Sequence, residues 1–322
     1  MKINSKYSVL IGIFLLIGQV KGQNLFKERM IEVTLHEQDT TLMNFVKTPD
    51  LFGERWDTLA QPSFWKLIMK TSPQMGVLNV ASTRQVLEVR SLVEWEKLTD
   101  EAKEAYRNEL RVKHGLAMDT RIFMTNGKSD FFVFEKVFPT ISRGVNIFAK
   151  NATDPWYAQA ILMIESPASH SSYSSAGALG PFQLMKSVAR NHGLRVDEQV
   201  DERKDFDKSA KASAHLLRTS CIPEAKRILN KFGIPVVGEI EYKLWFRLLV
   251  MHCYHAGAGN VDGVLTNVVK PTLGDKSIIT TIWRSEYGGF KNSSQNYSQL
   301  ALAALMILDD LILTKCKEIR EY

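Results

Sequence analysis

Apolar residues recur every three or four positions along most of the chain, a spacing that places them on one face of an α-helix. In the N-terminal third this pattern predicts helices over residues 61–70 and 82–98. In the remainder it predicts helices over residues 154–166, 205–218, 242–257 and 296–312. The sequence therefore predicts a mainly α protein.

Local signals mark where two of the predicted helices begin and end. Residues 98–115 predict a charged surface helix that starts at Thr99 or Asp100 and stops at Gly115. The helix over 154–166 has Asp154 as its N-cap and a proline at its first position. Pro167 disfavours helical geometry at the residue before it, so this helix should end just after Glu165.

The helical pattern is interrupted around Asn126-Gly127. Side chains that favour strands lie on both sides of this pair over residues 121–134, and Asn-Gly is a strong signal for a two-residue hairpin turn. We therefore divide the chain into an N-terminal helical region (23–118), a β-hairpin connector (119–137) and a C-terminal domain (138–322).

The first 22 residues are organised like a secretory signal peptide. Lys2 and Lys6 precede a short apolar run over residues 9–17, and the small residue Gly22 marks the expected cleavage point. A retained N-terminal anchor helix is the alternative. Because no later run reaches the usual length of a membrane span, we expect a mature chain without a transmembrane segment, exported to the periplasm or cell envelope.

Composition is that of a soluble globular protein, with 45% hydrophobic and 24% charged residues. Removal of residues 1–22 takes away three lysines and no acid, which lowers the formal net charge from +6 to +3. This mild excess suits an anionic extracellular polymer. It is too small for a nucleic-acid-binding surface, so we predict no nucleic-acid partner.

The cysteines and histidines do not form a recognisable metal or redox motif. Cys221, Cys253 and Cys316 include no C-x-x-C pair; export would permit a Cys221–Cys316 disulfide, and Cys253 lies in an apolar run typical of a buried thiol. His252 and His255 flank Cys253 without a further ligand cluster, which is more typical of structural histidines. We predict no metal and no cofactor.

One acid, Glu165, ends the apolar helix over 154–166, and no lysine or arginine lies between residues 158 and 185 to pair with it. An apolar setting and the negative end of a helix dipole both disfavour a carboxylate, so both should raise the pKa of Glu165. A carboxyl group kept protonated near neutral pH is suited to general acid catalysis. The alternative is a glutamate that only fixes the following turn.

Polar and flexible residues follow Glu165 in a fixed order. Ser166 supplies a hydroxyl, Gly177 and Gly180 allow a tight backbone course, and Gln183 offers an amide that donates and accepts. Farther along, two tyrosines lie at predicted helix ends, Tyr254 and Tyr297. Tyrosines in such positions often line carbohydrate grooves.

Taken in order, these segments resemble the motifs of the soluble lytic transglycosylase (SLT) family. They are Glu165-Ser166, SSAGALGPFQLM (174–185), CYHAG (253–257) and NYSQLALAAL (296–305). The resemblance covers about residues 138–310. It implies a lysozyme-like α-helical fold and cleavage of the MurNAc–GlcNAc bond of peptidoglycan.

The resemblance also assigns expected roles to these residues. Glu165 is the single catalytic acid and base, and Ser166 and Gln183 hold the substrate. Tyr254 stabilises the acid or the sugar, and Tyr297 faces Glu165 across the groove.

Three positions depart from the family pattern. His255 stands where the family usually has Asn, which leaves any amide contact from that position in doubt. Pro181-Phe182 replaces a common Leu-Met pair, and Cys253 replaces a small residue; both changes are expected to affect packing only.

Two alternative functions remain open. A hydrolytic muramidase would need a second acid to position water, for which Glu286 is the candidate. A catalytically idle peptidoglycan-binding module would have no use for the acid at position 165. The sequence leaves open the role of residues 23–118, the oligomeric state, and whether cleavage occurs within glycan strands or at their ends.

Overall fold

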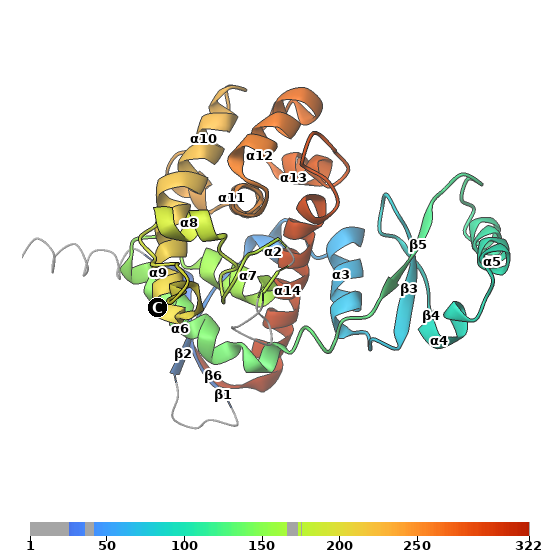
Figure 1. Ribbon diagram of the computed structural model, residues 1–322, viewed down its shortest axis with the longest axis horizontal. Coiled ribbons are helices and arrows are strands. Elements are labelled where there is room, and N and C mark those ends of the chain that lie inside the picture. The colour runs from blue at the N-terminus through green and yellow to red at the C-terminus, as the bar shows by residue number, and fades with distance from the viewer. Residues whose placement is uncertain (1–25, 36–41, 166–172, 175, 322) are drawn as a thin grey trace, which may run out of the picture. The chain divides into compact units, whose positions relative to one another are not determined.

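The computed structural model of the chain describes residues 26–35, 42–165, 173–174 and 176–321. The predicted signal peptide lies outside these residues. The protein is mainly α, as predicted (Figure 1). Its chain divides into two compact units. Unit 1 comprises Met1–Lys47, Glu135–Lys226 and Leu311–Tyr322, and unit 2 comprises Thr48–Phe134 and Arg227–Asp310.

Unit 1 combines a small antiparallel sheet with helices. The sheet has the strand order β2-β1-β6, formed by Leu42–Val46, Met30–Leu35 and Cys316–Glu321. The helices are α6 (Phe138–Lys150), α7 (Trp156–Glu165), α8 (Lys186–Asn191) and α9 (Phe206–Leu216). Helix α10 (Ile222–Asn230) contains the boundary between the two units.

A buried glutamine joins the sheet of unit 1 to its central helix. The amide nitrogen of Gln159 on α7 donates to the Val46 carbonyl at 3.0 Å, and its amide oxygen accepts from the Val46 N–H at 2.9 Å. These two bonds satisfy polar groups on both partners in a buried position, which removes the cost of burying them unpaired. They fix β2 against α7.

Unit 2 contains helices from both ends of the sequence. Those from the N-terminal part are α2 (Asp50–Gly53), α3 (Ala60–Lys70), α4 (Leu92–Glu96) and α5 (Asp100–Lys113). Those from the C-terminal part are α11 (Leu244–Ala256), α12 (Ala258–Val264), α13 (Lys276–Ile282) and most of α14 (Ser293–Lys315). Shorter 3-10 or π-helical turns in the two units are Lys27–Arg29, Phe134–Lys136, Glu202–Lys204, Leu217–Cys221, Gly238–Tyr242 and Leu265–Val269.

Part of unit 2 has a small hydrophobic core of its own. The sheet has the order β4-β3-β5, with strands Val86–Ser91, Met75–Val80 and Ile122–Asn126. Leu78, Trp95, Leu110 and Ile122 are buried together there, and they come from β3, α4, α5 and β5. Figure 1 shows α4 and α5 beside these strands.

The predicted hairpin around Asn126-Gly127 is wrong. Residues up to Asn126 do form strand β5, but its antiparallel partner is β3, in the register Gly76 with Asn126 and Val80 with Ile122. After Gly127 the chain makes turns instead of a second strand. Gly127 is packed tightly, since an added Cβ would lie 2.4 Å or less from the carbonyl oxygens of Thr71 and Ser72. The glycine therefore serves a close backbone contact and not a hairpin turn.

The predicted N-terminal helical region is mixed. A helix was expected over 82–98, but residues 86–91 form strand β4, which pairs with β3, and only α4 is helical. Val86 and Val89 favour extended structure, and pairing with a neighbouring strand overrides the helical spacing. Ser91 then caps α4 by accepting a hydrogen bond from the Glu94 N–H. Strands β1 and β2 also lie in this region.

Helix α14 is long and apolar enough to cross a membrane by length and composition alone, over Ser293–Thr314. This helix is an exception to the expectation from sequence that no run after residue 22 reaches the length of a membrane span. Within its most apolar stretch 67% of the residues are buried inside the protein, as in the core helix of a soluble protein. These properties do not decide between the two, so a mature chain without a membrane span stays a prediction.

The cysteines that the structure describes are not cross-linked to each other. Cys221 is a free, buried thiol, and burial raises its pKa to about 12. Cys253 is also buried, as expected from the apolar run around it. The side chain of Cys316 lies outside the described residues, but the free thiol of Cys221 contradicts a Cys221–Cys316 disulfide.

Candidate active site

Glu165 is the last residue of α7, the most deeply buried helix of unit 1. The helix begins with Asp154, whose carboxylate accepts a hydrogen bond from the Trp156 N–H at 3.1 Å, as the predicted N-cap requires. Every side chain from Trp156 to Ile164 is buried, and Glu165 is half-buried. The acid therefore lies where an otherwise buried helix first reaches solvent. Ser166 and Pro167 lie outside the described residues.

Gln183, which is expected from sequence to hold the substrate, belongs to a tight turn. Its backbone has a φ of +45°, and its side-chain nitrogen donates to the Gly180 carbonyl at 2.9 Å. A non-glycine residue in the left-handed region costs on the order of 1 kcal/mol and is typical of functional turns. Gly180 itself has a φ of +83°, and an added Cβ would lie 1.9 Å from the Arg203 carbonyl oxygen. Only glycine fits at this position.

Arg203, which was not predicted from sequence, fixes this turn through hydrogen bonds. Its guanidinium donates to the carbonyls of Gly177 and Leu184 at 2.9 and 3.0 Å, and it forms an ion pair with Asp201 at 2.7 Å. The Arg203 side chain is almost fully buried, and the pair lowers the pKa of Asp201. The turn that carries Gln183 is thus fixed at both ends by one cation.

The Pro181-Phe182 departure from the family pattern concerns packing, as expected. Phe182 is fully buried. Its ring stacks on Phe148 of α6 with centroids 5.5 Å apart, and it lies 5.8 Å from Phe206 of α9. The turn of unit 1 is therefore anchored to two helices by one aromatic side chain.

In unit 2 the structure brings together the ends of α11 and α14. His255, in the last turn of α11, stacks face to face on Tyr297 near the start of α14, with centroids 4.2 Å apart and an interplanar angle of 17°. Tyr297 is only 4% exposed. Tyr254 is half-buried beside His255, and α11 ends at Gly257 with a φ of +80°. The histidine that replaces Asn therefore provides an aromatic contact.

A buried hydrogen-bond network supports the same junction between α11 and α14 in unit 2. Trp283 donates its indole N–H to the Ser298 hydroxyl oxygen at 2.8 Å, and that oxygen lies 2.8 Å from His252 Nε2. Burial, and to a smaller extent His255, lower the pKa of His252 to about 3, so its imidazole is neutral near pH 7. His252 thus has a structural partner, and no group of three potential metal-ligating side chains occurs among the described residues.

The site residues predicted from sequence therefore fall into two sets. Glu165 and Gln183 belong to unit 1, and Tyr254 and Tyr297 belong to unit 2. Glu286, the candidate second acid, is an exposed residue of unit 2.

Comparison with known protein families matches residues 147–271 to the family model described as the transglycosylase SLT domain. This segment, 125 of the 322 residues, is similar to the SLT domain. The match includes Glu165, Gln183 and Tyr254, whereas Tyr297 and Glu286 lie beyond its end. None of the curated proteins compared with the chain matches it.

The SLT domain has two consequences for function. Its fold is of the mainly α, lysozyme-like type, which agrees with the helices described above. It also indicates, in general terms, a lytic-transglycosylase-type activity on peptidoglycan, which fits a location in the cell envelope.

Proposed function

We propose that this protein is a lytic transglycosylase that cleaves the MurNAc–GlcNAc bond and leaves 1,6-anhydro-MurNAc ends. One observation carries the proposal: Glu165 is the half-buried last residue of the buried helix α7, inside the SLT domain. An acid in this position combines an apolar wall with the negative end of a helix dipole. Both favour the protonated form that the first step needs.

The proposed reaction uses Glu165 twice. The protonated carboxyl gives its proton to the glycosidic oxygen, the bond from that oxygen to C1 of MurNAc breaks, and an oxocarbenium-like sugar forms. The C6 hydroxyl oxygen of the same sugar then bonds to C1, and its proton passes to the Glu165 carboxylate. The acid is restored, and no water is consumed.

A second carboxylate is unnecessary in this scheme, because the nucleophile is already part of the substrate. Well-oriented intramolecular groups reach effective concentrations of roughly 10⁵ M or more, far above that of water. Between Glu165 and Met185 the sequence contains no other acid. This absence supports the lyase over a muramidase that positions water with a second acid.

The neighbouring residues have supporting roles in the proposal. Gln183, held by the turn at Gly180 and Arg203, contacts the sugar amide or hydroxyl groups together with Ser166. Tyr254 stabilises the acid or the sugar through its hydroxyl. The buried Tyr297 acts mainly by fixing His255 through the stacked pair. Residues 1–22 direct export of the chain to the periplasm or cell envelope.

The test is the Glu165→Gln variant, which keeps the shape of the side chain and removes its proton chemistry. General acid–base catalysis contributes roughly 10²–10⁴-fold, and one group serves both halves here, so turnover of peptidoglycan should fall by about 10⁴-fold. Glu198→Gln removes an exposed acid of the same unit and should keep full turnover. Folding of both variants is checked by circular dichroism. A folded Glu165→Gln protein with nearly wild-type turnover would refute the assignment.

A further inference from the structure

A cavity of about 510 Å³ lies within unit 2, and none of the site residues predicted from sequence lines it apart from the candidate second acid Glu286. Its walls come from the turn between β3 and β4, from the start of β5, and from residues that precede and begin α14. The turn and the strand belong to the N-terminal part of the chain, and all of the lining residues lie outside the segment matched to the SLT domain. Three arginines line the cavity: Arg84, Arg121 and Arg284.

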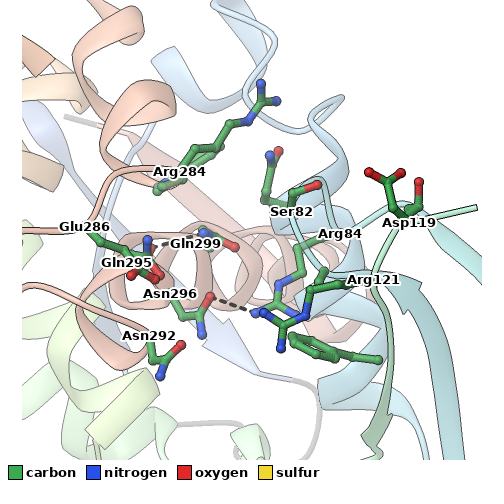
Figure 2. Close-up of a pocket in the computed structure, with 15 residues that line it drawn as sticks. Ser82, Arg84, Asp119, Arg121, Arg284, Glu286, Asn292, Gln295, Asn296 and Gln299 are labelled. Atoms are coloured by element: carbon green, nitrogen blue, oxygen red, sulfur yellow. Dashed lines mark hydrogen bonds between the residues drawn. The ribbon is translucent and has the colours of Figure 1, made fainter. Parts of the chain in front are cut away.

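Arg84 is held rigidly in the cavity wall by neutral groups. Its guanidinium donates to the side-chain oxygens of Asn79 and Asn296, each at 3.3 Å, and it lies over the rings of Phe64 and Trp65 at 5.3 and 5.7 Å. Its backbone has a φ of +60°, a left-handed conformation that disfavours a long side chain. In Figure 2 the Arg84 side chain reaches toward Asn296 on α14. A strained, fixed arginine is typical of a ligand site.

The arginines that line the cavity do not form ion pairs with the acids that line it. Throughout the described part of the chain, none of the three arginines has an acid within ion-pair distance, although Asp119 and Glu286 also line the cavity. Arg84 is half-buried, and burial lowers its pKa. A partly desolvated guanidinium without a carboxylate has much to gain from an anionic ligand.

The rest of the cavity surface is rich in side-chain amides. They are Gln61, Asn292, Gln295, Asn296 and Gln299. The amide nitrogens of Gln295 and Gln299 already donate to the Ser285 and Gln295 carbonyls, and the Gln299 amide oxygen accepts from the Trp65 indole N–H. An amide donates and accepts hydrogen bonds, so the other three can pair with the N–H and C=O groups of a peptide backbone. Three guanidiniums, two carboxylates and these amides therefore match a ligand with peptide bonds and charges of both signs. A simple polyanion would be opposed by the two acids.

We propose that this cavity binds a short peptide with free carboxylates and a free amino group. The arginines contact the carboxylates, Asp119 or Glu286 contacts the amino group, and the amides pair with the peptide bonds. Peptidoglycan strands carry stem peptides of this chemistry, and their identification as the natural ligand rests on the proposed function. Binding would then direct the protein to strands that still carry their peptides.

Calorimetry of the full mature chain with a free stem tetrapeptide tests the proposal without any need for catalysis. The tetrapeptide should bind, and the same peptide with its carboxylates amidated should not. Arg121→Gln and Arg284→Gln each remove one exposed guanidinium from the cavity and should each weaken binding about tenfold. Arg218→Gln removes an exposed arginine of unit 1 and is the matched control, with unchanged affinity.

Three results would overturn the proposal. One is the absence of tetrapeptide binding at millimolar concentration. Another is binding that the Arg121 and Arg284 variants leave unchanged. The third is equally tight binding of inorganic phosphate, which would show a general anion site. Because the readout is binding, an inactive protein that still binds the tetrapeptide would contradict the proposed function and not this inference.

Discussion

At the scale of single residues, the buried His252 shows how an ionisable side chain supports the candidate site without taking part in catalysis. It lies on α11, fully buried, with Ser298 of α14 as its partner and Trp283 bonded to the same hydroxyl. Its Nε2 atom lies 2.8 Å from the Ser298 hydroxyl oxygen. Because protonation would place a charge in a fully buried site, the junction that carries His255 and Tyr297 is most stable when His252 is neutral.

This dependence predicts an acid sensitivity. The folded-state pKa of His252 is about 3, below its usual value near 6.5. Between these two values the unfolded chain binds a proton that the folded chain does not, so stability falls as pH decreases through this window. On going from pH 7.5 to pH 5 this single group should lower the free energy of unfolding by about 2 kcal/mol.

His252→Gln keeps a hydrogen-bonding side chain and removes the titration. The variant should be less stable than the wild type at pH 7.5, but it should lose about 2 kcal/mol less on going to pH 5. Urea unfolding of both proteins at the two pH values measures this difference. An equal loss in the two proteins would show that His252 is not the titrating group.

At the scale of elements, helix ends were predictable from sequence because their signals are local. Thr99 caps α5 by accepting from the Ala102 N–H, and Asp205 caps α9 by accepting from the Lys208 N–H. Strand pairing was not predictable in the same way. The partner of β5 is β3, more than 40 residues earlier in the chain, and a turn signal at Asn126-Gly127 contains no information about so distant a partner.

The residues of the candidate site show the same contrast between local signals, which are visible in sequence, and contacts that form only in the folded chain. Glu165 and Gln183 were identified because an acid at the end of an apolar helix and a polar residue after glycines are visible in sequence. Arg203 was not, because it reaches the turn at Gly177 and Leu184 only in the folded chain. The cavity around Arg84 was missed for the same reason, since segments more than 200 residues apart form it.

The tight turn near Gln183 gives a prediction with a close internal control. Gly180 and Gly193 have nearly equal positive φ values of +83° and +89°, but only at Gly180 would an added Cβ meet a backbone atom, the Arg203 carbonyl oxygen. Gly193→Ala should therefore cost about 1 kcal/mol for its φ alone. Gly180→Ala should cost at least about 3 kcal/mol, because the Arg203 contact must break as well.

Chemical unfolding of the two alanine variants measures both costs. In addition, Gly180→Ala should reduce turnover of peptidoglycan by the protein that remains folded, since the turn positions Gln183, whereas Gly193→Ala should not. Equal destabilisation by the two substitutions would mean that the turn moves aside freely and that Arg203 does not hold it.

At the scale of the whole molecule, residues 147–271 match the SLT domain model, and an N-terminal part of the chain lies outside this match. That part supplies strands β1 and β2 to unit 1 and the β4-β3-β5 sheet to unit 2. It also supplies half of the wall of the arginine-lined cavity. The proposed catalytic acid therefore lies in the matched segment, and the proposed peptide recognition depends on residues outside it.

The central claim is that Glu165 acts alone and that the sugar's own C6 hydroxyl takes the place of water. Mass spectrometry of the products from purified peptidoglycan tests it most directly. The products should end in 1,6-anhydro-MurNAc, about 18 mass units lighter than the corresponding reducing sugars, because no water is added. Products with mainly reducing ends, lost in the Glu286→Gln variant, would contradict the account and show a hydrolytic muramidase that positions water with a second acid.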